Sequence, residues 1–308
     1  MEDKQSLKTG ERISVFHAIR GQIQTLAPYF FRRVKLPPAE RIEIPLRDGD
    51  FVDADFRKGA GRGLAILSHG LEGSSDAVYI RSITKSYLHR GWDVLAWNFR
   101  GCSGRRNRLH RLYNSGAVED LQDVVSYVSS KLKPERIQLA GFSLGGNLML
   151  LCLGRHSSWL AAHGVEKALA VSVPLNLAAT SAKIDKWWNL PYSNVFLRNL
   201  KSKIYWKEEQ FPGYYPLERI KKSKSLWEFD DNCTAPLHGF EGADDYYRKC
   251  SCLYVIPEIQ IPTLVVIAKN DPILARGNYE EVLEMNPKVE FLITEGGGHC
   301  GFWGMNVF

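Results

Sequence analysis

The 308-residue sequence predicts an α/β fold, with a mostly parallel sheet covered by helices on both faces. Short, fully apolar runs at 64–67 and 94–97 alternate with segments of helical periodicity. Strands that are apolar throughout are typical of parallel sheets, because helices pack on both of their faces. The composition agrees, since 44% hydrophobic and 24% charged residues are ordinary for a globular protein.

The amino-terminal part is expected to form a helix and then an antiparallel hairpin. Residues 41–46 and 51–56 have strand character, and Asp48 and Gly49 between them favour a tight turn. The segment 13–27 before the hairpin suits a helix. The chain therefore enters the sheet through an antiparallel pair of strands.

The remaining elements follow in a regular order. Apolar residues at 118, 121, 125, 128 and 132 are spaced by three and four, which places them on one face of a helix. We expect further helices over 75–90, 144–153 and near 279–285, and further strands over 137–140, 168–173, 263–268 and 289–293.

A long interruption separates the strand at 168–173 from the strand at 263–268. No clear apolar strand appears between 174 and 261, and this stretch is far longer than an ordinary crossover. It contains Trp187, Trp188, Trp206 and Trp227, half of the eight tryptophans. We interpret residues from about 175 to 260 as a helical cap inserted into a single domain that spans 1–308.

The sequence Gly-Phe-Ser-Leu-Gly at 141–145 matches the pattern G-x-S-x-G of a nucleophile elbow. An apolar strand precedes it and an apolar helix follows it, as that motif requires. The turn between them is too tight for a Cβ at either glycine, and it lifts the Ser143 hydroxyl clear of the sheet. The alternative is a strand–helix turn without chemistry, which the pattern alone does not exclude.

A serine hydroxyl becomes a nucleophile only beside a base that a carboxylate orients. With this elbow the chain order is Ser, then Asp or Glu, then His. Asp271 follows the expected strand 263–268 as the acid, and His299 follows the strand 289–293 as the general base. Both lie beyond the carboxyl ends of parallel strands, where ligands bind in open α/β sheets. A simple turn at Asp271 and an ordinary loop histidine are the alternatives.

Acyl transfer also needs hydrogen-bond donors for the developing oxyanion. The backbone N–H of Leu144, directly after the nucleophile, is one candidate. The second is the N–H of Leu71, in the loop after the strand 64–67, where flanking glycines let the backbone turn inward. We expect His69 in the same loop to be structural.

Several further stretches share a pattern with a known family: 24–26, 69–73, 99–104, 107–111, 141–147, 229–231, 245–247, 270–272 and 297–299. Through them the chain resembles the YheT-like branch of the α/β-hydrolase superfamily, esterases related to eukaryotic membrane-associated lipases and phospholipases. The resemblance implies the α/β-hydrolase fold, the triad Ser143, Asp271 and His299, and hydrolysis of carboxylic esters. Members usually continue past the His loop into a final helix, whereas the sequence given ends at Phe308. Either another element covers that face of the sheet or the end is truncated.

Substrate contacts are predicted less directly. Trp187 and Trp188 offer large apolar area for an acyl pocket or a membrane surface, and Arg108 in a basic loop could recognise a phosphate. Packing of the cap and a solvated charged face are the structural alternatives for these residues.

The function expected from these observations is a serine hydrolase that cleaves carboxylic esters, with short- to medium-chain or lipid-like acyl groups, through an acyl-enzyme on Ser143. An acyltransferase or thioesterase with the same triad, and a non-catalytic binding protein of this fold, are the alternatives. Neither metal nor organic cofactor is implied. The net charge of +6 without a nucleic-acid module argues against nucleic-acid binding. We expect a cytoplasmic protein, with peripheral contact to the inner face of the membrane as an additional expectation; the oligomeric state is not predicted.

Overall fold

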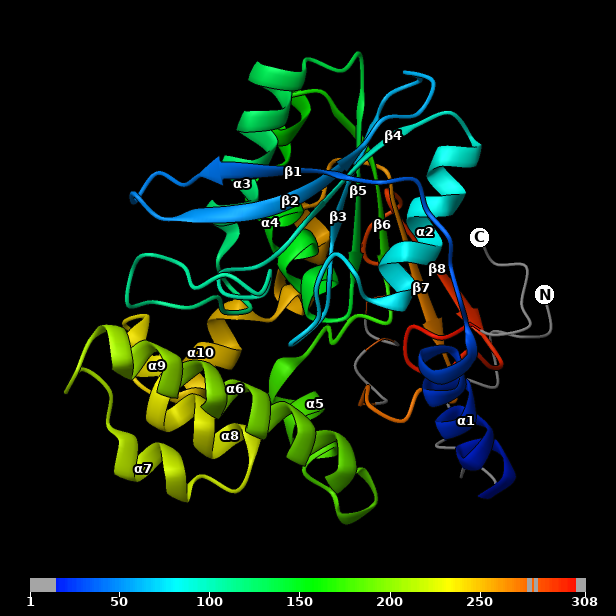
Figure 1. Cartoon of the computed structure of the whole chain (residues 1–308). Helices are drawn as coiled ribbons and strands as arrows, with labels where there is room; N and C mark the ends of the chain where they lie inside the picture. Colours follow the sequence, from blue (N-terminus) through cyan, green and yellow to red (C-terminus); the bar gives the residue numbers. More distant parts are fainter. Residues whose placement is uncertain (1–14, 276–278, 280–281, 303–308) are drawn as a thin grey trace.

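The computed structural model describes residues 15–275, 279 and 282–302, in which an eight-stranded sheet is surrounded by helices (Figure 1). The strands lie in the order β1-β2-β4-β3-β5-β6-β7-β8. β2 pairs antiparallel with β1 and β4, and all other pairs are parallel, which confirms the predicted sheet with its amino-terminal hairpin. The strands are β1 (Glu40–Pro45), β2 (Phe51–Arg57), β3 (Leu64–Ser68), β4 (Asp93–Trp97), β5 (Ile137–Phe142), β6 (Val165–Val171), β7 (Thr263–Ala268) and β8 (Val289–Thr294).

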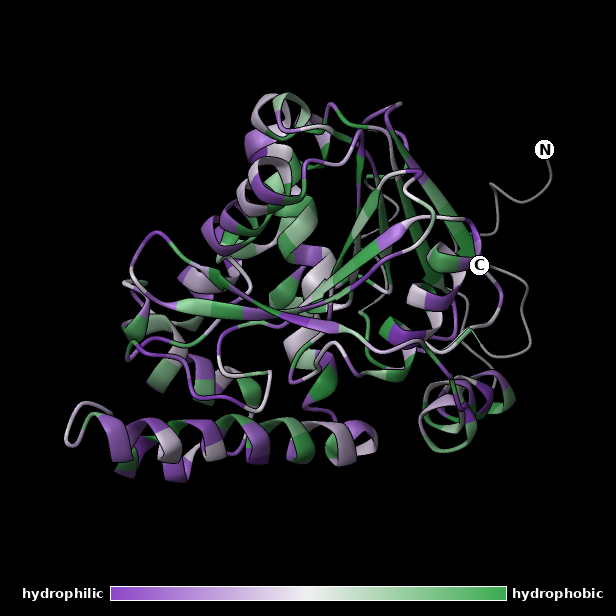
Figure 2. Cartoon of the chain, turned by 45° about the horizontal axis from the view of Figure 1, so that its top comes forward, coloured by the Kyte–Doolittle hydropathy of each residue, from purple (hydrophilic) through white to green (hydrophobic). Residues whose placement is uncertain are grey.

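Helices cover both faces of the sheet, as the fully apolar strands predicted. On one face pack α3 (Val118–Tyr127), a π-helical turn (Val128–Leu132) and α4 (Leu144–Ala162). On the other face lies α2 (Val78–His89), together with Cys300 and Phe302. Hydrophobic residues, green in Figure 2, line the central strands between these layers. α4 runs nine residues beyond the expected end at 153, across a kink at His156.

The stretch between β6 and β7 is helical and contains no strand (Figure 1). We call residues 177–258 the cap helices; they lie beyond the carboxyl ends of the strands. Residues of α5, α6, α7 and α8 share a separate apolar cluster that includes Ile184, Ile204 and Phe229. The elements are α5 (Leu177–Ile184), a 3-10 turn (Trp187–Asn189), α6 (Leu190–Gln210), α7 (Leu217–Lys222), α8 (Leu226–Phe229), η4 (Asp230–Thr234), α9 (Ala235–Leu237), α10 (Ala243–Cys250) and η5 (Cys252–Glu258).

The amino-terminal helix α1 (Val15–Phe31) also lies at the carboxyl end of the sheet, near β7 and β8 (Figure 1). It extends four residues past the expected end, through Pro28. Its buried residues are Gly21, Gln24, Ala27 and Pro28. Within the described ranges, no helix combines the length and the apolar character needed to cross a bilayer.

The helix expected near 279–285 is not seen in the residues that the structure describes there. Residues 280 and 281 lie outside the description, Tyr279 forms a bend and residues 282–284 form a turn. Apart from this segment, every expected strand and helix has a counterpart; the strand 263–268 has the expected ends, and the ends of most others are shifted.

Candidate active site

Ser143 lies in a strained turn between β5 and α4. Its backbone has φ +51° and ψ −124°, and residues other than glycine rarely adopt a positive φ. The Ser143 N–H donates to the carbonyl oxygen of Val171 at 2.9 Å, which ties the turn to the end of β6. Gly145 is required next to it, because a Cβ there would lie 2.3 Å from the carbonyl oxygen of His69. The turn therefore presses the amino end of α4 against the loop after β3.

The structure brings Ser143, His299 and Asp271 together, although they come from the ends of β5, β8 and β7. The Oγ atom of Ser143 lies 2.9 Å from Nε2 of His299, and Nδ1 of His299 lies 2.8 Å from Oδ2 of Asp271. The other carboxylate oxygen of Asp271 accepts the N–H groups of Ile273 and Leu274. The Asp271 carboxylate thus stabilises the turn that was the alternative interpretation, and its second oxygen also contacts the imidazole.

The pKa values of the His299 imidazole and the Asp271 carboxylate shift in opposite directions. Burial alone would lower the pKa of His299, but the adjacent Asp271 carboxylate raises it well above its usual value. Burial would likewise raise the pKa of Asp271, yet His299 and the two backbone N–H donors lower it. Asp271 is therefore an ionised carboxylate at neutral pH, which favours the proton on Nδ1 and leaves Nε2 facing the serine.

Leu71 and Leu144 line the same cavity as Ser143. Leu144 is the first residue of α4, where an N–H has no intrahelical acceptor and the helix dipole favours negative charge. On either side of Leu71, the N–H groups of Gly70 and Glu72 donate to the hydroxyls of Tyr79 and Tyr113. Within the described part of the chain the Leu71 N–H has no such acceptor, so both donors are available to a ligand.

A buried ion pair holds the Leu71 loop to the cap helices. Glu72, with φ +54°, accepts hydrogen bonds from Nζ of Lys203 on α6 at 2.8 Å and from the hydroxyl of Tyr113 at 2.7 Å. The side chains of Glu72 and Lys203 are 4% and 12% exposed, so solvent screens this pair little. Nothing in the sequence pattern indicated this contact.

Helix α1 holds the loop that carries His299. The hydroxyl of Thr25 accepts the N–H of His299 at 2.8 Å, and Oε1 of Gln24 accepts the N–H of Gly297 at 3.0 Å. Oε1 of Gln24 also accepts from Nδ2 of Asn270, next to Asp271, at 2.8 Å. Gly298 has φ +62°, and a Cβ there would lie 2.7 Å from the Thr25 hydroxyl. In the sequence, the stretch 24–26 shows only a family resemblance, which assigns no role to Gln24 or Thr25.

Two cavities meet at Ser143 and His299. The first, which we call the inner cavity, extends between α4 and the cap helices to Asp230, Thr234, Tyr246 and Tyr247. The second, the open cleft, lies between α1 and α6, and Leu26, Tyr29, Trp188 and Val195 are among its lining residues. Ser143, His299, Leu71, Phe196 and Ile273 line both cavities.

The remaining expected substrate contacts lie in different places. Trp188 lines the open cleft, whereas Trp187 is 77% exposed and borders neither cavity. Arg108 also borders neither; its guanidinium pairs with Glu43 at 2.6 Å and lies over the ring of Phe51.

His69 is a structural residue. It is fully buried, its Nδ1 lies 2.8 Å from the carbonyl oxygen of Gly70, and its Nε2 accepts the N–H of Phe99. Burial lowers its pKa to about 3, so the ring stays neutral. Among the residues that the structure describes, no three His, Cys, Asp or Glu side chains gather as metal ligands.

Comparison with known proteins agrees with the fold. Residues 66–304 match the family model described as alpha/beta hydrolase fold. The chain is 36% identical over 290 residues to "Putative esterase YheT" of Escherichia coli, which covers 92% of this chain and 84% of that protein. The chain therefore belongs to the α/β-hydrolase fold family, in the branch that contains YheT.

More distant relatives carry the names of lipases. The chain is 28% identical over 290 residues to human "Phospholipase ABHD3", with 92% of this chain and 69% of that protein covered. It is 27% identical over 249 residues to "Monoacylglycerol lipase" of Saccharomyces cerevisiae, covering 78% of this chain and only 55% of that protein. The solved Pyrococcus furiosus esterase Pf2001 superposes with a TM-score of 0.57 at 19% identity, over 87% of this chain and 89% of that one, which shows a shared fold.

The contacts of Gln24 predict that α1 orders the His299 loop. In Gln24→Met the N–H of Gly297 and Nδ2 of Asn270 lose their buried acceptor, and each lost acceptor costs about 1–3 kcal/mol. We expect faster hydrogen–deuterium exchange at residues 297–299, measured by mass spectrometry. The exposed Gln260→Met variant is the control and should exchange like the wild type. Unchanged exchange in Gln24→Met would show that α1 does not hold the loop.

Proposed function

We propose that the protein is a serine hydrolase that cleaves carboxylic esters through an acyl-enzyme on Ser143. The observation that carries the proposal is the continuous arrangement of Ser143 Oγ, the His299 ring and the Asp271 carboxylate, at 2.9 Å and 2.8 Å. The esterase and lipase names of the relatives support the same class of reaction. Acyl groups of short to medium length, or those of lipid-like esters, are the proposed substrates.

In the proposed mechanism, Nε2 of His299 takes the proton of Ser143 while Oγ attacks the ester carbonyl carbon. The negative charge that develops on the carbonyl oxygen is stabilised by the N–H groups of Leu71 and Leu144, each worth about 3 kcal/mol. His299 then donates its proton to the leaving alcohol. Water attacks the acyl-enzyme in the same way and releases the acid, with Asp271 orienting the imidazole throughout.

Loss of the Ser143 hydroxyl tests the nucleophile. We expect Ser143→Ala to lower kcat for p-nitrophenyl esters, from acetyl to palmitoyl, by about 10⁴-fold or more. The Ser130→Ala variant is the matched control, because Ser130 is exposed and borders neither cavity. Equal activity of Ser143→Ala and wild type would refute the assignment.

The raised pKa of His299 predicts the pH profile. Catalysis needs the neutral imidazole as base, so kcat/KM should fall as the pH drops through the pKa of His299. Because Asp271 raises that pKa above 6.5, the midpoint of the acidic limb should lie above pH 6.5. The measurement is hydrolysis of p-nitrophenyl acetate between about pH 5 and about pH 10. A midpoint below 6.5 would contradict the proposed role of the ion pair.

We further propose peripheral contact with an anionic membrane through the outer face of α1. The polar Gln24 is buried against the protein, whereas most large apolar side chains of the helix are exposed to solvent. No acidic residue occurs between 13 and 39, where Arg20, Arg32, Arg33 and Lys35 supply positive charge. An exposed apolar face beside basic residues is typical of helices that bind the lipid interface. The exposed side chains outside the open cleft are Val15, Phe16, Ile19, Ile23 and Phe31, and Leu26, Tyr29 and Phe30 continue this surface into the cleft.

Co-sedimentation with lipid vesicles tests this contact. We expect the wild type to bind vesicles that contain phosphatidylglycerol, and the double variant Phe16→Gln, Ile23→Gln to lose most of that binding. Tyr254→Gln, which removes an exposed aromatic ring outside α1, is the control and should bind normally. Absence of wild-type binding, or concentration-dependent self-association that the double variant abolishes, would refute the membrane contact.

A further inference from the structure

An ester has an acyl part and an alcohol part, and the two cavities that meet at Ser143 offer a separate place for each. The open cleft carries apolar and aromatic side chains, among them Leu26 and Phe30 of α1, Trp188 of the 3-10 turn and Val195 of α6, beside basic side chains such as Arg32 and Arg198. A flexible hydrocarbon chain fits such walls, because burial of apolar surface stabilises it at about 25 cal/mol per Å². The open cleft is therefore the better place for an acyl chain.

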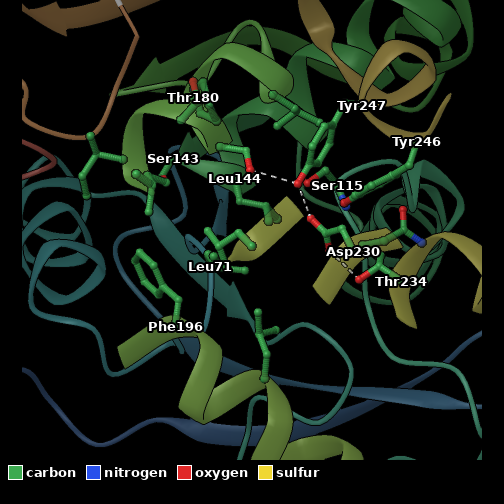
Figure 3. A pocket seen from close by; sticks show the side chains of 18 of the residues that line it. Leu71, Ser115, Ser143, Leu144, Thr180, Phe196, Asp230, Thr234, Tyr246 and Tyr247 are labelled. Carbon is green, nitrogen blue, oxygen red and sulfur yellow. Dashed lines mark hydrogen bonds between the residues drawn. The ribbon is translucent and has the colours of Figure 1, made fainter. Parts of the chain in front are cut away.

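The inner cavity differs in chemistry at the end remote from Ser143. Figure 3 shows Asp230, Thr234, Tyr246 and Tyr247 across the cavity from Ser143. The Thr234 hydroxyl donates to Oδ1 of Asp230 at 2.6 Å, and the Tyr247 hydroxyl donates to Oδ2 at 2.7 Å. In the part of the chain that the structure describes, no cationic side chain pairs with this carboxylate.

The Asp230 carboxylate has accepting capacity left. Its two oxygens offer about four lone-pair sites, and the two hydroxyl donors use one site on each oxygen. Burial raises the pKa of Asp230 to about 6, so the carboxylate is largely ionised at neutral pH without a counter-charge. An alkyl chain placed against it would leave this charge without a further donor, which is unfavourable in a buried site.

A purely structural role for Asp230 is the alternative, since the hydrogen bond from Tyr247 joins η4 to α10 and the bond from Thr234 lies within η4. That role does not require the carboxylate to line the cavity that holds Ser143, as Asp230 does. The neighbouring Asp231 provides a comparison: its Oδ1 accepts the N–H of Ala243, and it borders neither cavity.

We propose that the Asp230 end of the inner cavity is a subsite for the alcohol part of the substrate, and that it takes an alcohol with a free hydroxyl group, as in a glycerol monoester. The hydroxyl donates a hydrogen bond to the carboxylate while the acyl chain lies in the open cleft. This assignment rests on the proposed ester hydrolysis at Ser143. It makes Asp230 a specificity-determining residue, because a site built to bind a hydroxyl rejects an analogue that lacks it.

The kinetic test compares two esters of one fatty acid, 1-octanoylglycerol and ethyl octanoate. We expect Asp230→Asn, which keeps the shape of the side chain, to lower kcat/KM for the glycerol ester by about 10- to 100-fold, as for a lost hydrogen bond to a charged group. The rate with ethyl octanoate should change less than about 2-fold. Asp231→Asn, the same change one residue away, should leave both rates unchanged.

Each other outcome overturns the proposal. Equal losses on both esters indicate a structural role for Asp230, and no loss on either shows that the carboxylate touches no substrate. If octanoylcholine depends on Asp230 more strongly than octanoylglycerol does, the subsite binds a cation and the hydroxyl assignment is wrong.

A binding measurement separates this proposal from the proposed function. The ether 1-O-octylglycerol cannot be hydrolysed, and its affinity for the Ser143→Ala protein is measured by calorimetry with and without Asp230→Asn. A loss of affinity of about 10-fold or more supports the subsite even if the wild type hydrolyses no ester. Unchanged affinity refutes the subsite even if Ser143 proves to be the nucleophile.

Discussion

The strained turn at Ser143 is the constraint on which the arrangement of the site depends. At this positive φ, Oγ of Ser143 lies 2.9 Å from Nε2 of His299, and Leu144 begins α4 directly after it. The close approach of Gly145 to the backbone of His69 then fixes the distance between α4 and the loop of Leu71. One turn of the chain therefore sets the positions of the nucleophile and of both proposed oxyanion donors.

The parts of the site that the turn does not fix are held by segments distant in sequence. Helix α1 supplies acceptors for the backbone of the His299 loop, and Lys203 on α6 binds Glu72 beside Leu71. Both helices also wall the open cleft. A displacement of α1 or of α6 would therefore move side chains that hold the loops of His299 and Leu71.

The sheet and the three central residues could be predicted because their signals are local. Apolar runs mark the strands, and the order of Ser143, Asp271 and His299 follows from the ends of those strands. The contact of Gln24 with Asn270 could not be predicted, since 246 residues separate them and two polar residues in a helix ordinarily face solvent. The length of α4 was underestimated because polar residues and a kink at His156 interrupt its apolar pattern. Asp230 lies in a stretch of family resemblance, but only the folded structure shows that it lines the same cavity as Ser143.

The most direct test of the central claim is to observe the acyl group on Ser143. The protein is mixed with p-nitrophenyl octanoate, quenched in acid during the steady state, digested, and analysed by tandem mass spectrometry. The account predicts an octanoyl ester on the Ser143 hydroxyl in the wild type, and its absence in Ser143→Ala. Turnover without an acyl group on this residue, or with the acyl group on another side chain, would contradict the account.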